Sequence, residues 1–262
     1  MDAAIDAGGS CTDVLLAEGR HILVSRTLQG SDAPEASTGV LDEVRERFGI
    51  PRRLFVTGAR ASRVSYKELT LTGVDEMTAI GRGAQRLAEK STCLAMSMGT
   101  GTALVHANGD AYRHLGGTGV GGATLVGLGR LILDEGNPDT LMALARNGDA
   151  TRVDLTVGDL GYKAVGILTP DDTAANLGKL DSRTPEDLAA AIHTLVGEVV
   201  GTVASQAAHR ADSPNDIVVL GKPAANPVLR SVLDRVGRLF GTRFTFPDEG
   251  SVGVAVGALN EW

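Results

Sequence analysis

The sequence has few cysteines, few aromatic residues and no excess of positive charge. Only two cysteines occur among 262 residues, Cys11 and Cys93, and each lies in an apolar or glycine-rich segment. Neither a disulfide framework nor a cluster of thiolate metal ligands is therefore expected. The formal net charge of −7 argues against a surface built to neutralise nucleic-acid phosphates or anionic lipid. We expect no nucleic-acid partner.

Long apolar runs and low-complexity segments are also lacking. No stretch approaches the roughly 18 consecutive apolar residues that a membrane-spanning helix needs. Met1 leads almost directly into a predicted strand, without the basic and then apolar pattern of a targeting segment. We therefore expect a cytoplasmic protein with no membrane partner.

Glycine, by contrast, is abundant. The chain has 34 glycines, whereas aromatic residues make up only 3% of it. Apolar residues account for 43%, which is ample for a core, and a chain of this length suits two lobes of ordinary size. So many glycines indicate many turns in which the backbone comes close to something else.

The beginning of the chain predicts three strands, a helix and a fourth strand. A short buried strand at 3–7 turns at two glycines into a strand at 12–17, and a third strand follows at 21–26. Apolar spacing then predicts a helix at 35–48 and a strand at 53–57. This order is typical of a ribonuclease H-like lobe.

The same order of elements begins again after a bridging helix at 75–90. A strand at 93–98 runs into a glycine turn and a return strand at 103–106. Repetition of strand, glycine turn and strand is the hallmark of the actin-like ATPase architecture. We therefore predict a two-lobed α/β fold of this kind, with lobes at 1–88 and 89–262 and a nucleotide cleft between them.

The second lobe is expected to contain most of the helices. An Ala- and Val-rich helix at 187–208 suits either the core or a subunit interface. The other predicted elements are helices at 123–133, 138–145, 227–240 and 250–259, and strands at 217–220 and 243–246.

Three glycine-rich turns follow predicted strands and could hold phosphate. Their backbone N–H groups can converge on an anion, since no Cβ atom blocks its approach. The third turn also leads into a helix, whose N-terminus adds a partial positive charge. Asp6, at a strand end, could orient Mg²⁺ through water. The candidate ATP ligands here are Asp6, Gly8, Gly9, Ser10, Gly99, Thr100, Gly101, Thr102, Gly117, Gly119, Gly121 and Gly122.

The turns match neither of two common nucleotide motifs. No Gly-Lys-Ser/Thr sequence follows them, which excludes a Walker A loop. The third turn follows a very short strand, and no acidic residue closes a new strand about 20 positions later, as a dinucleotide-binding unit requires.

The motifs taken together resemble type II pantothenate kinases over nearly the whole chain. They are Ile5-Asp6-Ala7-Gly8-Gly9-Ser10, Met98-Gly99-Thr100-Gly101-Thr102, the turn 116–122, Gly148-Asp149, Val153-Asp154-Leu155, Ala174-Ala175-Asn176 and Gly253-x-x-x-Gly257-Ala258-Leu259. The resemblance implies an actin-like fold, ATP and Mg²⁺, and a homodimer. It also implies transfer of the γ-phosphoryl group of ATP to the primary hydroxyl of pantothenate, a small alcohol, as the first step toward coenzyme A.

The resemblance assigns roles to individual residues. The catalytic carboxylate falls on Glu76, within Glu76-x-x-x-x-x-x-Gly83, and such a group can orient a hydroxyl and take its proton. Asp75 is the alternative base, and Glu76 could instead be a solvated acid favoured by the helix dipole. Gly221 and Lys222 resemble the adenosine-binding turn, which completes the ATP ligands. Thr118, Thr173 and Asn176 fall on the substrate side.

Two positions depart from the family's pattern. Where the family usually has an arginine that contacts substrate and phosphate, this chain has His114, with Arg113 one residue earlier. Both are candidate catalytic residues, although one residue of slip along a strand reverses the side a residue faces.

The second departure is at Asp13, where the kinases commonly have a lysine. An anion in place of a cation near a phosphate site calls for another positive group, and the candidates are Arg60, Arg63 and Lys222.

Four functions remain open at this point. The first is an ATP-dependent kinase for pantothenate or a closely related alcohol, and the second is a kinase for a different small hydroxyl compound. The third is a non-catalytic nucleotide-binding regulator. The fourth, an ATPase activator of a radical dehydratase, needs cysteines that bridge an iron–sulfur cluster, and Cys11 and Cys93 are badly placed for that.

Overall fold

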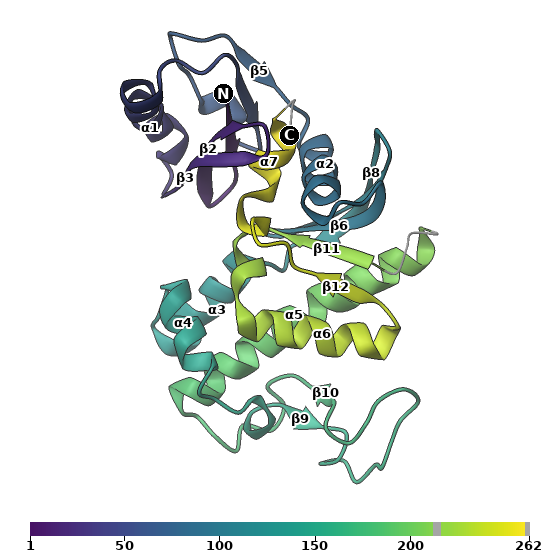
Figure 1. The fold of residues 1–262 in the computed structure, drawn as a ribbon. Coiled ribbons are helices and arrows are strands. Elements are labelled where there is room, and N and C mark those ends of the chain that lie inside the picture. Colours follow the sequence, from purple (N-terminus) through teal and green to yellow (C-terminus); the bar gives the residue numbers. More distant parts are fainter. Residues whose placement is uncertain (212–215, 260–262) are drawn as a thin grey trace.

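The computed structural model describes residues 1–211 and 216–259 and contains two five-stranded sheets (Figure 1). The first has the order β3-β2-β1-β4-β5, with β1 (Asp2–Ala7), β2 (Cys11–Glu18), β3 (His21–Gln29), β4 (Leu54–Thr57) and β5 (Leu71–Gly73). The second has the order β12-β11-β6-β7-β8, with β6 (Thr92–Met98), β7 (Thr102–Asn108), β8 (Ala111–Thr118), β11 (Asp216–Leu220) and β12 (Arg243–Thr245).

The two sheets repeat one topology. In the first, β1 pairs antiparallel with β2 and parallel with β4, and in the second, β6 pairs antiparallel with β7 and parallel with β11. The outer strands continue the pattern, since β3 and β8 are antiparallel additions and β5 and β12 are parallel ones. The predicted repeat, and with it the actin-like fold, is confirmed.

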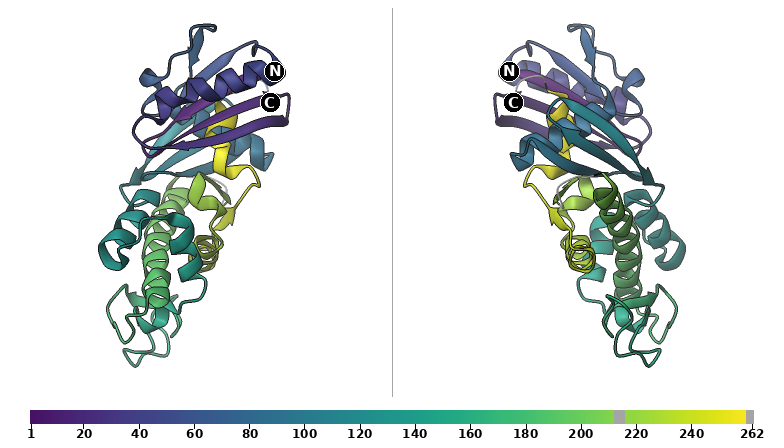
Figure 2. Two further views of the ribbon diagram at one scale, coloured as in Figure 1. Left: turned by 90° about the vertical axis from the view of Figure 1, so that its left-hand side faces the viewer. Right: turned by 90° about the vertical axis from the view of Figure 1, so that its right-hand side faces the viewer.

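Helices and sheets alternate in five layers (Figures 1 and 2). Helix α1 (Ala33–Phe48) packs on one face of the first sheet through an apolar cluster. Helices α2 (Glu76–Ala88) and α7 (Gly253–Ala258) fill the space between the two sheets and share one core with both. Beyond the second sheet lie α3 (Gly122–Leu133), α4 (Pro138–Ala145), α5 (Pro185–Arg210) and α6 (Pro227–Phe240).

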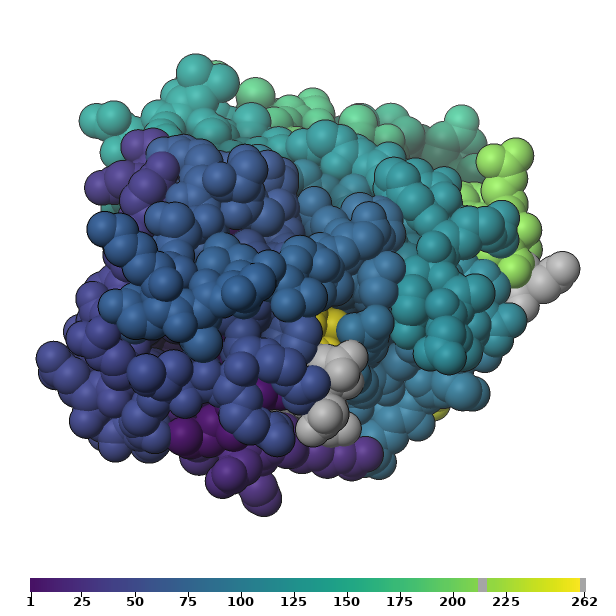
Figure 3. Space-filling model, turned by 90° about the horizontal axis from the view of Figure 1, so that it is seen from above, coloured from purple at the N-terminus to yellow at the C-terminus, as the bar shows by residue number. Residues whose placement is uncertain are grey.

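The two central helices cross in direct backbone contact. A Cβ atom at Gly83 of α2 would lie 2.0 Å from the carbonyl oxygen of Gly253, and one at Gly257 of α7 would lie 1.8 Å from that of Ala79. Seen from above, the yellow C-terminal residues appear only as a small area between blue segments (Figure 3). Helix α7 is buried in the core that both sheets and α2 share.

Helix α5 is the one helix, among the residues that the structure describes, that is long and apolar enough to cross a membrane. Of its most apolar 18-residue window, 67% is buried inside the protein, where its side chains pack in the core with α3 and α6. Its apolar surface is therefore largely used in the core, one of the two roles that the sequence left open.

A small two-stranded sheet lies at the end of the molecule farthest from α1 (Figure 1). It consists of β9 (Leu155–Thr156) and β10 (Thr173–Ala175). Next to it Asp154 is buried, and its Oδ1 accepts a hydrogen bond of 2.7 Å from the N–H of Leu177, whereas its Oδ2 has no partner. Burial, and to a lesser degree Glu198, raise the pKa of Asp154 to about 6.

This buried carboxyl predicts a pH-dependent stability. The folded state holds the Asp154 proton more tightly than the unfolded state, so ionisation above pH 6 destabilises the fold. Asp154→Asn should raise the free energy of unfolding by about 1–3 kcal/mol at pH 8, and the gain should shrink as the pH falls from 6 toward 4. Urea unfolding at several pH values measures this, with the exposed Asp171→Asn as control. A gain of equal size at pH 4 and pH 8 would contradict the assignment.

Candidate active site

The first glycine turn presents two acidic side chains side by side. Asp6 and Asp13 are direct partners across the antiparallel pair of β1 and β2, so their side chains share one face. Gly58, at the end of β4, has φ +94°, and a Cβ atom there would lie 2.5 Å from Asp6 Oδ1. Glycine at this position leaves room for the Asp6 carboxylate. The sequence predicted only that a strand ends at Gly58. The signal that could have indicated its role is that it follows a strand expected to lie beside that of Asp6.

The carboxylate of Asp6 lies in a strongly acidic environment. Burial, then the charge of Asp13 and then that of Glu76 raise the pKa of Asp6 to about 8, and Lys222 opposes the shift. The charges of one carboxyl group on β2 and one on α2 thus act on the carboxyl of Asp6 on β1. A cation or a proton is needed there to relieve their repulsion.

The second and third turns are packed against each other through their backbones. The N–H of Gly122 donates to Gly99 O at 2.8 Å, and within the second turn the N–H of Gly99 donates to Gly101 O at 2.8 Å. A Cβ atom at Gly121 would lie 2.6 Å from Gly101 O. Side chains at these glycines would push the two turns apart.

Threonine hydroxyls hold the third turn in place. Thr102 donates through Oγ1 to Val120 O at 2.8 Å, and Thr118 accepts through Oγ1 from Val120 N at 3.2 Å. A Cβ atom at Gly117 would lie 2.1 Å from Thr102 O, whereas one at Gly119 would meet nothing within 4 Å. Gly117 is thus required by packing, and Gly119 faces open space.

Contacts between residues far apart in sequence join the first turn to the second. Ser10 Oγ and Thr100 Oγ1 lie 2.9 Å apart, and a Cβ atom at Gly9 would lie 2.6 Å from the same Thr100 oxygen. Arg60 donates through Nε to Gly8 O at 2.5 Å and so supports the first turn from behind. Gly9, Ser10 and Thr100 are exposed.

The turn at Gly221 is wedged against the end of β6. Gly221 has φ +98°, and a Cβ atom there would lie 2.2 Å from Met98 O. Lys222 follows and reaches across to the first sheet, where its Nζ lies 2.7 Å from Asp13 Oδ1. The structure thus brings together all four turns that the sequence assigned to ATP.

One of the three candidate cations pairs with Asp13. Arg63 donates to Glu35 at 2.7 Å, and Arg60 donates to the backbone oxygens of Gly8, Gly30 and Ser31, so neither forms an ion pair with Asp13 among the described residues. Lys222 is the side chain that offsets the charge of Asp13.

The two acids at the start of α2 differ in their surroundings. Asp75 caps the helix, because its Oδ1 accepts from Thr78 N at 2.9 Å and from Thr78 Oγ1 at 3.1 Å. Glu76 makes no hydrogen bond or ion pair within the described part of the chain and is half-buried. Burial first, and the charge of Asp75 second, raise the pKa of Glu76. Of the two, Glu76 is the one whose carboxylate is available to a ligand.

Arg113 and His114 lie on opposite faces of β8. Tyr112 packs against α2, since a Cβ atom at Gly81 would lie 2.3 Å from its ring. His114, two residues later in the strand, shares that face, and Arg113 is directed to the other side. The α2 face, to which Glu76 belongs, therefore carries the histidine and not the arginine.

Thr173 and Asn176 are not brought to the glycine turns. Thr173 donates to Glu198 Oε1 at 2.8 Å and Asn176 donates to Glu198 Oε2 at 2.9 Å, and Arg235 binds the same carboxylate at 2.7 Å. This group lies by α5 and α6 toward the distal sheet (Figure 1). A substrate role for Thr173 and Asn176 stays a prediction.

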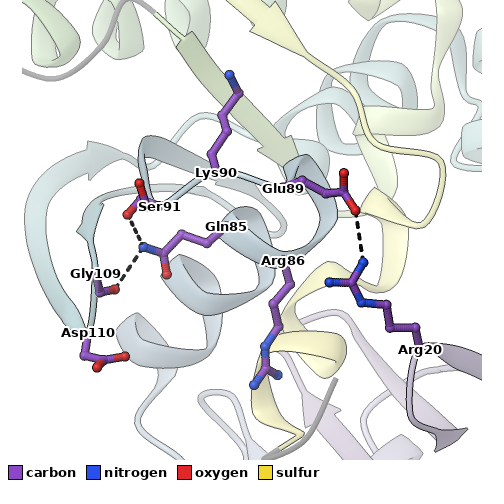
Figure 4. A pocket seen from close by; sticks show the side chains of 8 residues that line it. All are labelled: Arg20, Gln85, Arg86, Glu89, Lys90, Ser91, Gly109 and Asp110. Atoms are coloured by element: carbon purple, nitrogen blue, oxygen red, sulfur yellow. Dashed lines mark hydrogen bonds and ion pairs between the residues drawn. The ribbon is translucent and has the colours of Figure 1, made fainter.

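A pocket at the other end of α2 is separate from these turns (Figure 4). It is lined by Arg20, Gln85, Arg86, Glu89, Lys90, Ser91, Gly109 and Asp110. Gln85 closes one side by donating to Ser91 O and Gly109 O, and Arg20 pairs with Glu89 at 3.0 Å.

Among the residues that the structure describes, no group of three or more His, Cys, Asp or Glu side chains could hold a metal ion by itself.

The sequence profile of one family, Fumble, matches residues 65–222, more than half of the chain. The chain belongs to the Fumble family. The match spans Glu76, the second and third turns, the distal sheet and Lys222.

Curated relatives resemble this Fumble-family chain over nearly its full length. A type II pantothenate kinase of Bacillus anthracis is 29% identical over 272 residues, covering 97% of this chain and 95% of the relative. A type II pantothenate kinase of Oceanobacillus iheyensis is 29% identical over 213 residues, covering 78% and 80%.

Solved structures share the fold of this Fumble-family chain. The activator of the 2-hydroxyisocaproyl-CoA dehydratase from Clostridium difficile, with bound ADPNP, has a TM-score of 0.65 and 18% identity, covering 98% of this chain and 92% of that one. A ROK family glucokinase from Streptomyces griseus, in complex with glucose and AMPPNP, has a TM-score of 0.61 and 13% identity, covering 98% and 97%. At these identities the likeness shows the fold alone.

Proposed function

We propose that this Fumble-family protein transfers the γ-phosphoryl group of ATP to the primary hydroxyl of pantothenate, the first step of coenzyme A biosynthesis. Curated relatives named type II pantothenate kinase support the reaction. One structural observation carries it. Exposed glycine turns from both halves of the chain meet through Ser10 and Thr100, and the charge of Glu76, which has no hydrogen-bond or ion-pair partner among the described residues, acts on the Asp6 carboxyl.

ATP would lie across the turns, with its phosphates against their N–H groups. Gly9, Ser10, Gly99 and Thr100 are exposed, and the absence of a Cβ atom at the glycines lets an anion approach the backbone. The N-terminus of α3 adds a partial positive charge behind the third turn. Two solved structures of the same fold, both named with bound nucleotide analogues, suit this arrangement.

The acidic cluster fits Mg²⁺ bound together with the nucleotide. Mg²⁺ keeps several waters and needs only one or two carboxylates plus phosphate oxygens, and Asp6 has two carboxyl neighbours that favour a cation. Asp6 would hold the ion, directly or through water. When bound, the ion neutralises negative charge on the phosphates.

Glu76 would act on the acceptor. Its raised pKa makes it a better proton acceptor than an ordinary carboxylate, and no partner in the described chain competes for it. It would orient the hydroxyl toward the terminal phosphate and take its proton. His114, on the α2 face, would contact the acceptor, and Thr118 would position it beside the third turn.

A homodimer and a cytoplasmic location belong to the same proposal. Large exposed apolar side chains gather near the distal sheet, namely Leu160, Tyr162, Val165, Ile167 and Leu180. Clusters of this kind mark contact surfaces, which suits a second copy of the chain. Light scattering of the purified protein measures the mass directly.

A coupled assay of ADP release tests the reaction. Purified protein with Mg²⁺-ATP should release ADP when pantothenate is added, and a panel with pantetheine and other small alcohols ranks the acceptors. Release with another alcohol but not with pantothenate would establish the second candidate, a kinase for a different hydroxyl compound. ATP binding without release for any acceptor would establish a regulator.

His114 is the observation that favours the second candidate, and its replacement separates the two. His114→Arg places a fixed positive charge on the α2 face and should raise kcat/KM for pantothenate about tenfold, the effect of roughly one charge-assisted contact. Arg113→Lys, on the other face of β8, is the control and should leave kcat/KM nearly unchanged. A loss of pantothenate activity in His114→Arg would mean that the histidine itself is adapted to the acceptor.

A further inference from the structure

The first turn places acidic side chains beside the position proposed for the phosphates of ATP. Asp6 and Asp13 are direct cross-strand partners, and the charges of Asp13 and Glu76 both act on the Asp6 carboxyl. Like charges directly opposite each other destabilise a strand pair, and they also repel an incoming anion. A positive side chain at this point would offset part of that repulsion in addition to a bound metal ion.

Lys222 is placed to supply this positive charge. Its backbone follows Gly221, which is wedged against Met98 at the end of β6, and the next residue, Pro223, lies close to Gly122 of the third turn. Its ammonium group extends from there to Asp13 beside the first turn. The cation therefore spans the glycine turns of both halves of the molecule.

Asp13 holds the ammonium group at that point. Its Oδ1 accepts from Lys222 Nζ at 2.7 Å and from Thr27 Oγ1 at 2.6 Å, so two donors hold the same carboxylate oxygen. The Asp13 side chain is 7% exposed, whereas that of Lys222 is 37% exposed. The carboxylate is thus enclosed in the protein, whereas the lysine side chain is partly exposed.

We propose that Lys222 is the cation that contacts the phosphates of ATP, and that Asp13 is a positioning residue that holds the ammonium group between the turns. The inference rests on the proposed function only in taking ATP as the ligand. It gives the aspartate at position 13 a role, because its carboxylate holds a cation from the second half of the chain beside the first turn. It also makes the phosphate site complete only when both halves are together.

Binding of a fluorescent ATP analogue and of the matching adenosine analogue tests the role of Lys222, with Mg²⁺ present and no alcohol. Lys222→Met should weaken the ATP analogue by about tenfold to a hundredfold, the effect of losing a charge-assisted contact, and leave the adenosine analogue within about twofold. Lys222→Arg should keep most of the affinity. Equal weakening of both analogues would overturn the inference, since a lysine that only joins the two halves would affect both alike.

Variants of Asp13 test the positioning role. Asp13→Asn should weaken the ATP analogue in the wild-type background and strengthen it in the Lys222→Met background, where the carboxylate only repels phosphate. Tighter binding in the wild-type background would overturn the positioning role. The double variant Asp13→Asn/Lys222→Met leaves no buried unpaired charge. If Lys222→Met fails to fold, circular dichroism shows whether the double variant is folded, and its affinity for the ATP analogue is measured instead.

The result is separable from the proposed reaction. If the Lys222 and Asp13 variants show the expected binding pattern but the wild-type protein phosphorylates no pantothenate, the reaction is refuted and the inference is supported. If the wild-type protein phosphorylates pantothenate but Lys222→Met binds the ATP analogue normally, the reaction is supported and the inference is refuted.

Discussion

Glu76→Gln is expected to lower pantothenate-dependent ADP release by about a hundredfold to ten-thousandfold, the range found for the loss of a general base. The amide keeps the shape of the side chain but cannot take a proton from the hydroxyl. Glu76 makes no hydrogen bond or ion pair in the described chain, so the melting temperature should stay within a few degrees of wild type. Steady-state kinetics and a thermal melt of the same preparation measure both.

Asp75→Asn is the matched control for this variant. Asn also caps helices well, so the variant should keep both stability and most of the activity. If Asp75→Asn abolished turnover and Glu76→Gln did not, the catalytic carboxylate would have been assigned to the wrong residue. Because the pKa of Glu76 is raised, the base is protonated earlier as the pH is lowered. The decline of kcat should therefore begin at a higher pH than it would for a carboxylate of ordinary pKa.

Among glycine-to-alanine substitutions in the central layer of α2 and α7, Gly257→Ala should destabilise the fold most. The new Cβ atom would lie 1.8 Å from Ala79 O and 2.6 Å from Gly83 N, and both are backbone atoms that cannot move without shifting α2. We expect a loss of about 3 kcal/mol or more in the free energy of unfolding. Urea unfolding followed by circular dichroism measures it.

Gly39→Ala is the control for this second variant. Gly39 is an exposed residue of α1, and a Cβ atom there would meet nothing within 4 Å. Alanine is a better helix former than glycine by roughly 0.5–1 kcal/mol, so this variant should be slightly more stable than wild type. If Gly257→Ala unfolded at the same urea concentration as Gly39→Ala, α2 and α7 would not cross in the close contact described above.

The sequence predicted the elements whose patterns are local. Short, mostly apolar runs gave β1, β2, β6 and β11, and glycine after a strand gave the turns, because both signals lie within a few residues of the structure that they determine. The repeated order of elements then predicted the second sheet from the first. The strands β5, β9 and β10 were not predicted, since runs of two or three residues carry no periodicity.

Partners distant in sequence were beyond such patterns. Arg60, Arg63 and Lys222 were equal candidates for balancing Asp13, and only the tertiary arrangement shows that the partner is Lys222, 209 residues away. Gly58 was likewise unassigned, because its role depends on β4 lying parallel to β1.

The division of the chain into lobes at 88 and 89 stays a prediction. The closing helix was assigned by sequence order to the second lobe, yet α7 shares a core with both sheets and packs against α2. Sequence order could not reveal this, because the helix is short and glycine-rich and fits the narrow space between two layers only once both exist.

A crystal structure of the protein with Mg²⁺ and a non-hydrolysable ATP analogue tests the central claim most directly. We expect the triphosphate to lie against the backbone of Gly9–Ser10 and Gly99–Thr100, with its terminal phosphate facing Glu76. A nucleotide bound elsewhere, for example in the pocket at the C-terminal end of α2, with the glycine turns in contact only with one another, would contradict the account.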